Sequence, residues 1–586
     1  MGTTRIISSG RGREWSARPE AAGPMLAHGW PDFLDGPLAS AEPPAGLELV
    51  KRGRGRAVFR FNAAGRTYYV KDYGPAGPAR RLRSLVGGGP ARREWDALVA
   101  ALRAGLDVPE PVALAGAWAE RIVTAAVPGE RLDEYLFSHY FESRCAGSDP
   151  PYPGARPPEL VAVFRRRRRP PDGSIGPKTL AHLLADLVAH LAEADLALPD
   201  LHPGNLLVAS EGGRRRLWLV DLADAVRPAP AGSVLAHLVR LEHFFEPIAS
   251  PAERLRCHRR VLELLGGGPG ARQVAAETAD YRRRFYRRRD RRTRRESKYF
   301  RRIAVGPWRG WATADWAERM ARRLESEDPT AGGETVKAGR TAEVRRVALA
   351  DGTPLFFKRH KRPSRLGRSR ALKAFRRGHA LLVRGIATAR PAAALDRRRG
   401  GLPADTLLAT EAVKGEKLSD WLRSRPPAAE RRAVARRLAH LVRRMHDAGF
   451  SHRDLKAPNL LVSPAHGEAA RPVLVDLDGL AYKGYVSEGR RAKDLMRLSV
   501  SLEEWGVARA TDRLRFLRAY LAPAGAPAPM TTRARRHGDP STRSGSPRAG
   551  SRGDTEPGRE LARWWRRVAR LSIRKWAMLQ RKTQER

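Results

Sequence analysis

Residues 450–480 read FSHRDLKAPNLLVSPAHGEAARPVLVDLDGL, and the organisation of the whole chain is best understood from these residues. Asn459 follows Asp454 at a spacing of five residues. Short apolar runs at 460–462 and 472–475 predict two strands, the second of which ends directly before Asp476. We therefore expect two polar loops at the ends of neighbouring strands, facing one cleft.

The spacing H-R-D-x-x-x-x-N is that of the catalytic loop of protein kinases. In that chemistry Asp454 would accept the proton of the attacking hydroxyl, and Asn459 would hold a magnesium ion. Asp476, in the sequence DLDG, stands where the metal-binding aspartate of D-F-G belongs. A tripeptide such as HRD is a weak signal in an arginine-rich chain, but the adjacent strands and an upstream lysine, Lys358, favour a kinase-type active site.

Three further phrases in the second half carry a family resemblance: PLFFKR at 354–359, HALLVRGI at 379–386 and MHDAG at 445–449. With these phrases the chain resembles the bacterial lipopolysaccharide kinase family, the Kdo/WaaP and InaA-like proteins. The resemblance implies a protein-kinase-like fold and phosphorylation of a sugar in the lipid-linked core of an outer-membrane glycolipid. ATP and Mg²⁺ as cofactors are predicted from the catalytic-loop and metal residues.

The same pattern occurs in the first half, most visibly at VPGERLDEYL (127–136) against VKGEKLSDWL (413–422). Asp200 and Asn205 keep the catalytic-loop spacing without the preceding His and Arg, and Asp221 supplies the second metal carboxylate. We therefore predict a tandem duplication: an α+β protein with two protein-kinase-like bilobal domains, each with a β-rich N-lobe and a helical C-lobe.

Each predicted N-lobe has a lysine at the end of a strand, Lys71 in the first half and Lys358 in the second, where it can pair with nucleotide phosphates. Glycines in the preceding turns would let the backbone approach those phosphates. They are Gly53 and Gly55 in the first half and Gly339 in the second.

Glu94, on a predicted helix after Lys71, is placed to pair with that lysine; an ordinary solvated glutamate is the alternative. In the second half Ala374 aligns with Glu94, and residues 359–409 contain no glutamate. The lysine–glutamate pair is therefore expected to be absent there, which leaves the positioning of Lys358 open.

The formal net charge of +48 indicates anionic partners such as phosphosugars, acidic lipid or nucleic acid, although an arginine-rich composition explains the total equally well. Two cysteines exclude a disulfide framework and a zinc-type cysteine cluster. The sequence has neither an apolar run of membrane-spanning length nor the apolar core of a signal peptide. We expect a cytoplasmic protein, with peripheral contact to the acidic inner face of the cytoplasmic membrane left open.

The expected organisation is a disordered leader (1–45), a first kinase-like domain (46–250) with an insertion (147–178), a basic helical connector and linker (251–333), a second kinase-like domain (334–522), a disordered low-complexity segment (523–558) and a basic amphipathic helix (559–586). Arginines and aromatic residues alternate within the connector, which suits a nucleic-acid or lipid surface or a helix that ties lobes together. The last helix could pack on the second C-lobe or lie in a membrane interface.

The leading hypothesis is an ATP- and Mg²⁺-dependent phosphotransferase acting on a sugar hydroxyl of a lipopolysaccharide core or a similar lipid-linked glycoconjugate. A kinase for a protein or a small molecule is the second, and a tandem pseudokinase serving as a basic scaffold is the third. Both halves retain the lysine and the metal-site residues, which favours an enzyme. The second half has the complete H-R-D loop but lacks the glutamate, whereas the first has the lysine–glutamate pair but lacks the His and Arg that brace the loop. Because the base and the metal ligands act directly on the transition state and the ion pair mainly orients the lysine, we predict that the second half is the principal catalyst. The first half is expected to bind nucleotide, with slow turnover left open.

Overall fold

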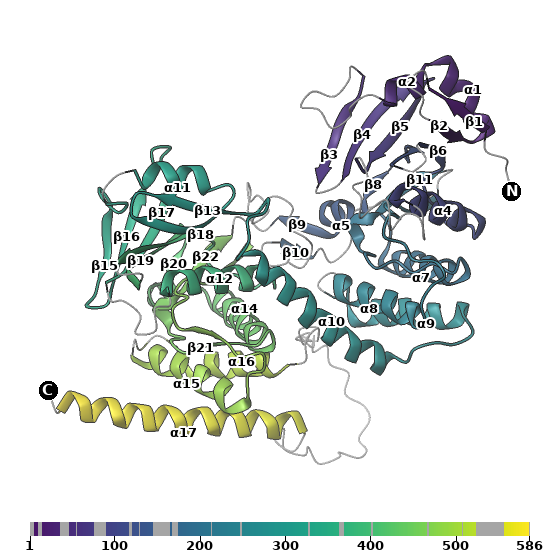
Figure 1. Cartoon of the computed structure of the whole chain (residues 1–586). Helices are drawn as coiled ribbons and strands as arrows, with labels where there is room; N and C mark the ends of the chain where they lie inside the picture. The colour runs from purple at the N-terminus through teal and green to yellow at the C-terminus, as the bar shows by residue number, and fades with distance from the viewer. Residues whose placement is uncertain are drawn as a thin grey trace, which may run out of the picture. The chain divides into compact units, whose positions relative to one another are not determined.

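The computed structural model describes residues 5–9, 14–35, 46–53, 56–74, 89–115, 120–127, 129–143, 164–166, 174–211, 214–246, 249–325, 328–361, 369–399, 402–465, 468–504, 506, 508–522 and 556–584. The chain forms two compact units, Met1–Glu142 with Arg166–Arg283 and Ser143–Arg165 with Arg284–Arg586. Each unit has its own seven-stranded antiparallel sheet and its own helical part (Figure 1). The predicted α+β class with two kinase-like bilobal domains is confirmed.

The sheet of the first unit holds, in spatial order, β1 (Arg5–Ser8), β2 (Glu14–Ala17), β6 (Pro111–Ala115), β7 (Arg121–Ala125), β5 (Arg66–Asp72), β4 (Arg56–Ala63) and β3 (Glu48–Gly53). Side chains along β4 and β5 alternate between buried and more exposed positions, because one face of these strands covers a core. Phe59 and Val70, which have no exposed surface, lie in that core.

The sheet of the second unit holds, in spatial order, β13 (Phe300–Val305), β14 (Trp308–Thr313), β18 (Pro391–Arg399), β19 (Leu402–Glu411), β17 (Pro354–His360), β16 (Ala342–Ala348) and β15 (Glu334–Ala338). Counted within each unit, the two sheets have the same strand order. This equality agrees with a tandem duplication, which itself stays a prediction.

Smaller sheets and helices complete each unit. In the first, β8 (Glu130–Arg131), β11 (Leu206–Glu211) and β12 (Arg214–Leu219) form a three-stranded sheet. Its counterpart in the second is β20 (Glu416–Lys417), β22 (Leu460–Ala465) and β23 (Glu468–Leu474), and β21 (Phe450–His452) pairs with β24 (Leu480–Tyr482). Two further short strands are β9 (Phe141–Ser143) and β10 (Phe164–Arg166).

The helices up to the division between the units are α1 (Pro19–Ala27), α2 (Trp30–Asp35), α4 (Pro90–Arg103), α5 (Leu132–Tyr140), α7 (Pro177–Glu193), η1 (Pro203–Asn205), α8 (Ser233–Phe245), α9 (Pro251–Leu264) and α10 (Ala271–Arg292), within which the division falls. Those that follow are α11 (Ala317–Arg323), α12 (Arg370–Leu382), α13 (Leu418–Arg423), α14 (Ala428–Asp447), η2 (Ala457–Asn459), α15 (Glu488–Glu504), α16 (Ala510–Leu521) and α17 (Glu556–Gln584). Among the described residues no helix has the length and apolarity to cross a bilayer.

The prediction of a disordered leader is wrong for the described residues of 1–45. Strands β1 and β2 extend the first sheet, and β2 pairs with β6. Trp15, Met25 and Leu34 have no exposed surface, and the Trp30 ring lies 4.4 Å from that of Tyr68. These apolar residues are held by contacts with strands distant in sequence, which the Gly-, Pro- and Arg-rich composition concealed.

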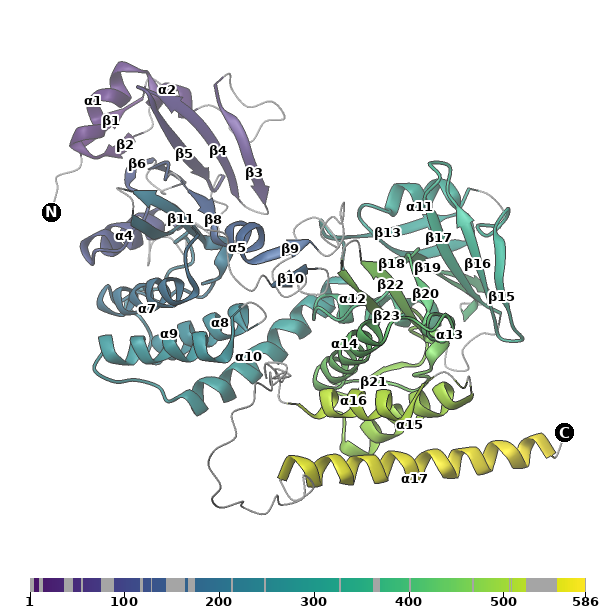
Figure 2. The same ribbon diagram turned by 180° about the vertical axis from the view of Figure 1, so that it is seen from behind.

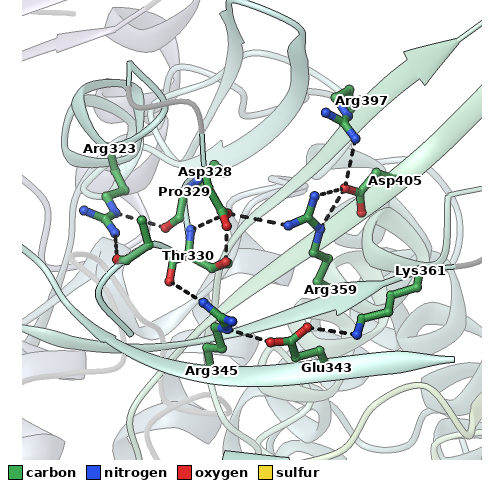
Figure 3. A network of polar contacts seen from close by, with 11 residues as sticks. Arg323, Asp328, Pro329, Thr330, Glu343, Arg345, Arg359, Lys361, Arg397 and Asp405 are labelled. Atoms are coloured by element: carbon green, nitrogen blue, oxygen red, sulfur yellow. Dashed lines mark hydrogen bonds and ion pairs between the residues drawn. The ribbon is translucent and has the colours of Figure 1, made fainter. Parts of the chain in front are cut away.

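The prediction of a separate connector over 251–333 is also wrong. Helix α9 and the first part of α10 belong to the first unit, whereas β13, β14 and α11 belong to the second. The end of this predicted connector, residues 328–333, is tied to α11 and to the second sheet, as Figure 3 shows: Arg323 Nε donates to the Pro329 carbonyl (2.9 Å), and Asp328 lies 3.6 Å from Arg359. Most of the expected insertion, including residues 167–169 of its arginine run, and residues 523–555 of the low-complexity segment lie outside the described residues.

Helix α17 packs along α15 and α16 in the second unit (Figure 2). Its Trp564 is buried in the core of the second C-lobe, and Trp576 Nε1 donates to Glu503 Oε2 (2.7 Å). Arg563 and Arg567 pair with Glu488 at 3.3 and 3.2 Å. Of the two alternatives for this helix, the structure shows packing on the C-lobe.

Candidate active sites

The catalytic-loop residues of the second unit lie together between β21 and β22. Asn459 Nδ2 donates to the Asp454 carbonyl (2.8 Å) and to Asp454 Oδ2 (3.1 Å). Lys456 Nζ lies 2.9 Å from Asp454 Oδ1, and both side chains are about half exposed. The predicted base therefore faces solvent with a cation beside it, where an acceptor hydroxyl can reach it.

Asp494 of α15, which has no exposed surface, anchors the residues directly before this loop. Its Oδ2 accepts hydrogen bonds from Ser451 Oγ (2.7 Å) and the His452 amide (2.9 Å). Arg497 NH1 lies 2.9 Å from Asp494 Oδ1. Sequence reasoning missed this residue; the available signal was an aspartate at a core position of an amphipathic helix.

The two predicted loops of the second unit are joined directly. His452 Nε2 lies 2.5 Å from the Asp476 carbonyl oxygen, and the Arg453 amide donates to the Gly479 carbonyl (2.9 Å). A Cβ at Gly479 would lie 2.9 Å from the Asp454 amide nitrogen, so a side chain does not fit there. These contacts fix Asp476 relative to Asp454.

Lys358 contacts both acidic residues of DLDG. Its Nζ lies 2.9 Å from Asp476 Oδ1 and 2.7 Å from Asp478 Oδ2. Burial alone would lower the pKa of Lys358, but the two carboxylates outweigh it and raise that pKa. Burial alone would raise the pKa of Asp476, but Lys358 outweighs it and lowers that pKa. Both groups are therefore charged in the folded protein.

In the first unit, Lys71 pairs with Glu94 and lies 3.3 Å from Asp221 Oδ1. The Tyr73 hydroxyl donates to Glu94 Oε2 (2.7 Å), which fixes the glutamate inside the lobe. Lys71, Glu94 and Asp221 therefore lie together, and of the two alternatives for Glu94 the structure shows the pair with Lys71.

Lys71 and Lys358 have partners from different elements in the two units. Helix α4 begins at Pro90 and α12 at Arg370, so Glu94 and Ala374 occupy the same position in their helices. The first unit has Ala223 two residues after Asp221, where the second has Asp478. Besides Asp221 or Asp476, each lysine thus contacts a second carboxylate. It is Glu94 of α4 in the first unit and Asp478 of the DLDG segment in the second.

The catalytic loop of the first unit has different anchors. Asn205 Nδ2 donates to the Asp200 carbonyl (3.0 Å), and His202 lies 3.5 Å from Asp200 Oδ2, in the sequence position of Lys456. The Leu198 amide donates to His237 Nε2 (2.9 Å) of α8. Burial lowers the pKa of His237 to about 4, so a neutral imidazole accepts this hydrogen bond where the second unit uses a buried carboxylate.

Two of the three predicted glycines, Gly53 and Gly339, lie within the described residues. The Gly339 amide donates to the Ala342 carbonyl (3.0 Å) at the turn between β15 and β16. Gly53 ends β3, and Gly55 lies outside the described residues.

Among the described residues no cluster of three or more His, Cys, Asp or Glu side chains is arranged for a metal ion. The donor set of the second unit, one asparagine and one or two aspartates, still suits Mg²⁺. This ion is commonly bound in kinases by one or two carboxylates together with substrate phosphates and water. Asn459 and Asp476 fit that pattern, with Asp478 beside them.

Residues 314–520 match the model of the lipopolysaccharide kinase (Kdo/WaaP) family. The second unit is similar to the lipopolysaccharide kinases. This match confirms the resemblance inferred from the sequence motifs and indicates a kinase. It covers one half of the predicted duplication.

Individual relatives match over shorter stretches. The lipopolysaccharide core heptose(I) kinase WaaP of Pseudomonas aeruginosa is 34% identical over 104 residues, which is 17% of this chain and 38% of that protein. A putative cyclin-dependent kinase F-2 of Oryza sativa subsp. japonica is 41% identical over 104 residues, 17% of this chain and 30% of that protein. The chain thus spans about a third of the length of these relatives. A solved structure, WaaP in complex with acyl carrier protein, is 29% identical with a TM-score of 0.27 and covers 32% of this chain and 78% of that chain.

Proposed function

We propose that the chain is an ATP- and Mg²⁺-dependent phosphotransferase whose second unit phosphorylates a sugar hydroxyl of a lipopolysaccharide core or a similar lipid-linked glycoconjugate. The observation that carries this proposal is that two loops carrying Asp454, Asn459 and Asp476 hydrogen-bond to each other, and that Lys358 of β17 contacts Asp476. The family match of residues 314–520 supports the choice of acceptor. Phosphorylation of a protein or a small molecule by the same residues is the alternative.

In this proposal, each of the clustered residues of the second unit has a separate role in phosphate transfer. Asp454 accepts the proton of the sugar hydroxyl as its oxygen attacks the γ-phosphorus of ATP. The bond between the γ-phosphorus and the bridging oxygen then breaks, and ADP leaves. Lys358 holds the nucleotide phosphates, and Lys456 places positive charge beside the base. Mg²⁺, held by Asn459 and Asp476, would neutralise phosphate charge.

The test is to incubate the purified chain with γ-labelled ATP, Mg²⁺ and a fractionated cell envelope. We expect label in the lipopolysaccharide fraction, and we expect chelation of Mg²⁺ with EDTA to abolish its transfer. A chain with Asp476→Asn is the matched control, since it retains the fold but loses a metal carboxylate. Transfer that survives both EDTA and Asp476→Asn would refute the proposal, and label on proteins would favour the alternative acceptor.

Asp478 is expected to position Lys358 in place of the missing glutamate. Asp478→Ala should lower kcat by about ten- to a hundredfold, the usual cost of losing a supporting partner of an active-site group. Adding Ala374→Glu to that variant should restore a large part of kcat, because it recreates the arrangement of Lys71 and Glu94. Steady-state kinetics of the wild type, the single variant and the double variant measures this, and a double variant no faster than Asp478→Ala would contradict the role.

A further inference from the structure

Arg56 forms an ion pair with Asp221, the carboxylate predicted to bind metal in the first unit. At the start of β4, its NH1 donates to Asp221 Oδ1 (2.8 Å) and its NH2 to Asp221 Oδ2 (2.5 Å). Lys71 lies 3.3 Å from the same Oδ1. Both oxygens of Asp221 are therefore engaged by cationic side chains.

The second unit has no charge at the matching position. Strand register places Val58 opposite Lys71 and Val344 opposite Lys358. Two residues earlier on each strand, Arg56 in the first unit corresponds to Ala342 in the second. The two units thus differ in one cationic side chain directed at the metal aspartate.

The charge balance of the two clusters differs accordingly. In the first unit, Arg56 and Lys71 neutralise Asp221 and Glu94. In the second, counted over the residues that the structure describes, one lysine faces two carboxylates, Asp476 and Asp478, which leaves one negative charge. A divalent cation is attracted to the second cluster, whereas at Asp221 it would have to displace Arg56 and would be repelled by Lys71.

Electrostatics at Asp221 agrees with this geometry. Burial alone would raise the pKa of the Asp221 carboxyl, but Lys71 and Arg56 outweigh it and hold that pKa well below its usual range. The Arg56 side chain is about a quarter exposed, so its guanidinium can also be reached by a ligand. A guanidinium binds phosphate oxygens through two parallel hydrogen bonds, and it remains charged under all ordinary conditions.

We propose that the first unit binds the phosphates of a nucleotide without a divalent cation, with Arg56 taking the place of the metal. Arg56 and Lys71 contact the phosphates, and Asp221 holds both side chains in position. The first unit is then a metal-independent nucleotide-binding module beside a metal-dependent catalytic one. The inference goes beyond the proposed function, which concerns the second unit, and relies on the prediction from the sequence that the first unit binds nucleotide.

The experiment uses the full chain with Lys358→Ala and Asp476→Asn, which disable the second site. A fluorescent ATP analogue labelled on the ribose is titrated in excess EDTA. We expect saturable binding that Arg56→Ala weakens by about tenfold or more, the scale of a lost charge-assisted hydrogen bond, and Arg56→Lys weakens less. No saturable binding in EDTA, or an unchanged Kd in Arg56→Ala, would overturn the inference. Thermal melting checks that all variants are folded.

A reciprocal variant tests the same idea in the second unit. Ala342→Arg in the otherwise unmodified chain should place an arginine beside Asp476 and raise the Mg²⁺ concentration needed for half-maximal phosphate transfer about tenfold or more. An unchanged Mg²⁺ dependence would count against Arg56 as a substitute for metal. If the disabled chain binds the analogue in EDTA through Arg56 but the wild-type chain transfers no phosphate with ATP and Mg²⁺, the proposed function is refuted and this inference still stands.

Discussion

Asp454→Asn should lower phosphate transfer by at least about a hundredfold, the contribution usual for a general base, whereas Asp200→Asn should leave most of the activity. In the second unit, Asp454 is hydrogen-bonded to Asn459, and the preceding Arg453 amide donates to the Gly479 carbonyl of the DLDG loop. Asp494 accepts hydrogen bonds from Ser451 and His452, directly before this loop. In the first unit, Arg56 pairs with Asp221, the carboxylate predicted to bind metal, so we expect a base at Asp200 to lack a competent metal site.

Both variants are to be assayed in the full-length chain with the same acceptor, ATP and Mg²⁺. Each removes one negative charge from an exposed loop and preserves the shape of the side chain, so each is the other's control. If Asp200→Asn abolishes transfer and Asp454→Asn is nearly silent, the roles of the units are reversed.

Asp494→Ala should destabilise the second unit by about 3 kcal/mol or more, because it leaves the Ser451 hydroxyl, the His452 amide and Arg497 without their buried partner. The catalytic loop loses its support in the same step, so transfer should fall as well. Denaturant unfolding of the variant and the wild type gives the change in free energy.

The matched control for this prediction is Asp447→Ala. Like Asp494, Asp447 pairs with arginine, here Arg443 and Arg491 at 2.8 Å each, but its side chain is 43% exposed. Exposed ion pairs contribute about 1 kcal/mol or less. Equal losses of stability in the two variants would show that the buried carboxylate is not the anchor of the loop.

The sequence was sufficient for those parts of the fold and the site that depend on local patterns. The spacing of Asp454 and Asn459 fixes their place in one turn, and the apolar runs around them become β22 and β23. The repeated segments 127–136 and 413–422 each contain the start of a helix, α5 in the first unit and α13 in the second. These features are predictable because each is determined by neighbours within about ten residues.

Contacts between residues that are far apart in the sequence could not be predicted from sequence patterns. The leader enters the first sheet through pairing of β2 with β6, which are about a hundred residues apart in the chain, and composition carries no signal for such pairing. Arg56 and Asp221 are 165 residues apart, and Lys358 and Asp476 are 118 apart. Asp478 can be read in DLDG, but its contact with Lys358 depends on how β17 and the DLDG segment lie in the folded protein.

The central claim is that the second unit transfers phosphate from ATP to a sugar hydroxyl. Its most direct test is phosphorus NMR with mass spectrometry of the core oligosaccharide released from dephosphorylated lipopolysaccharide after incubation with the chain, ATP and Mg²⁺. We predict a new phosphomonoester on a sugar, formed by the wild-type chain and absent with Asp476→Asn. No new phosphomonoester, or one formed equally well by Asp476→Asn, would contradict the claim.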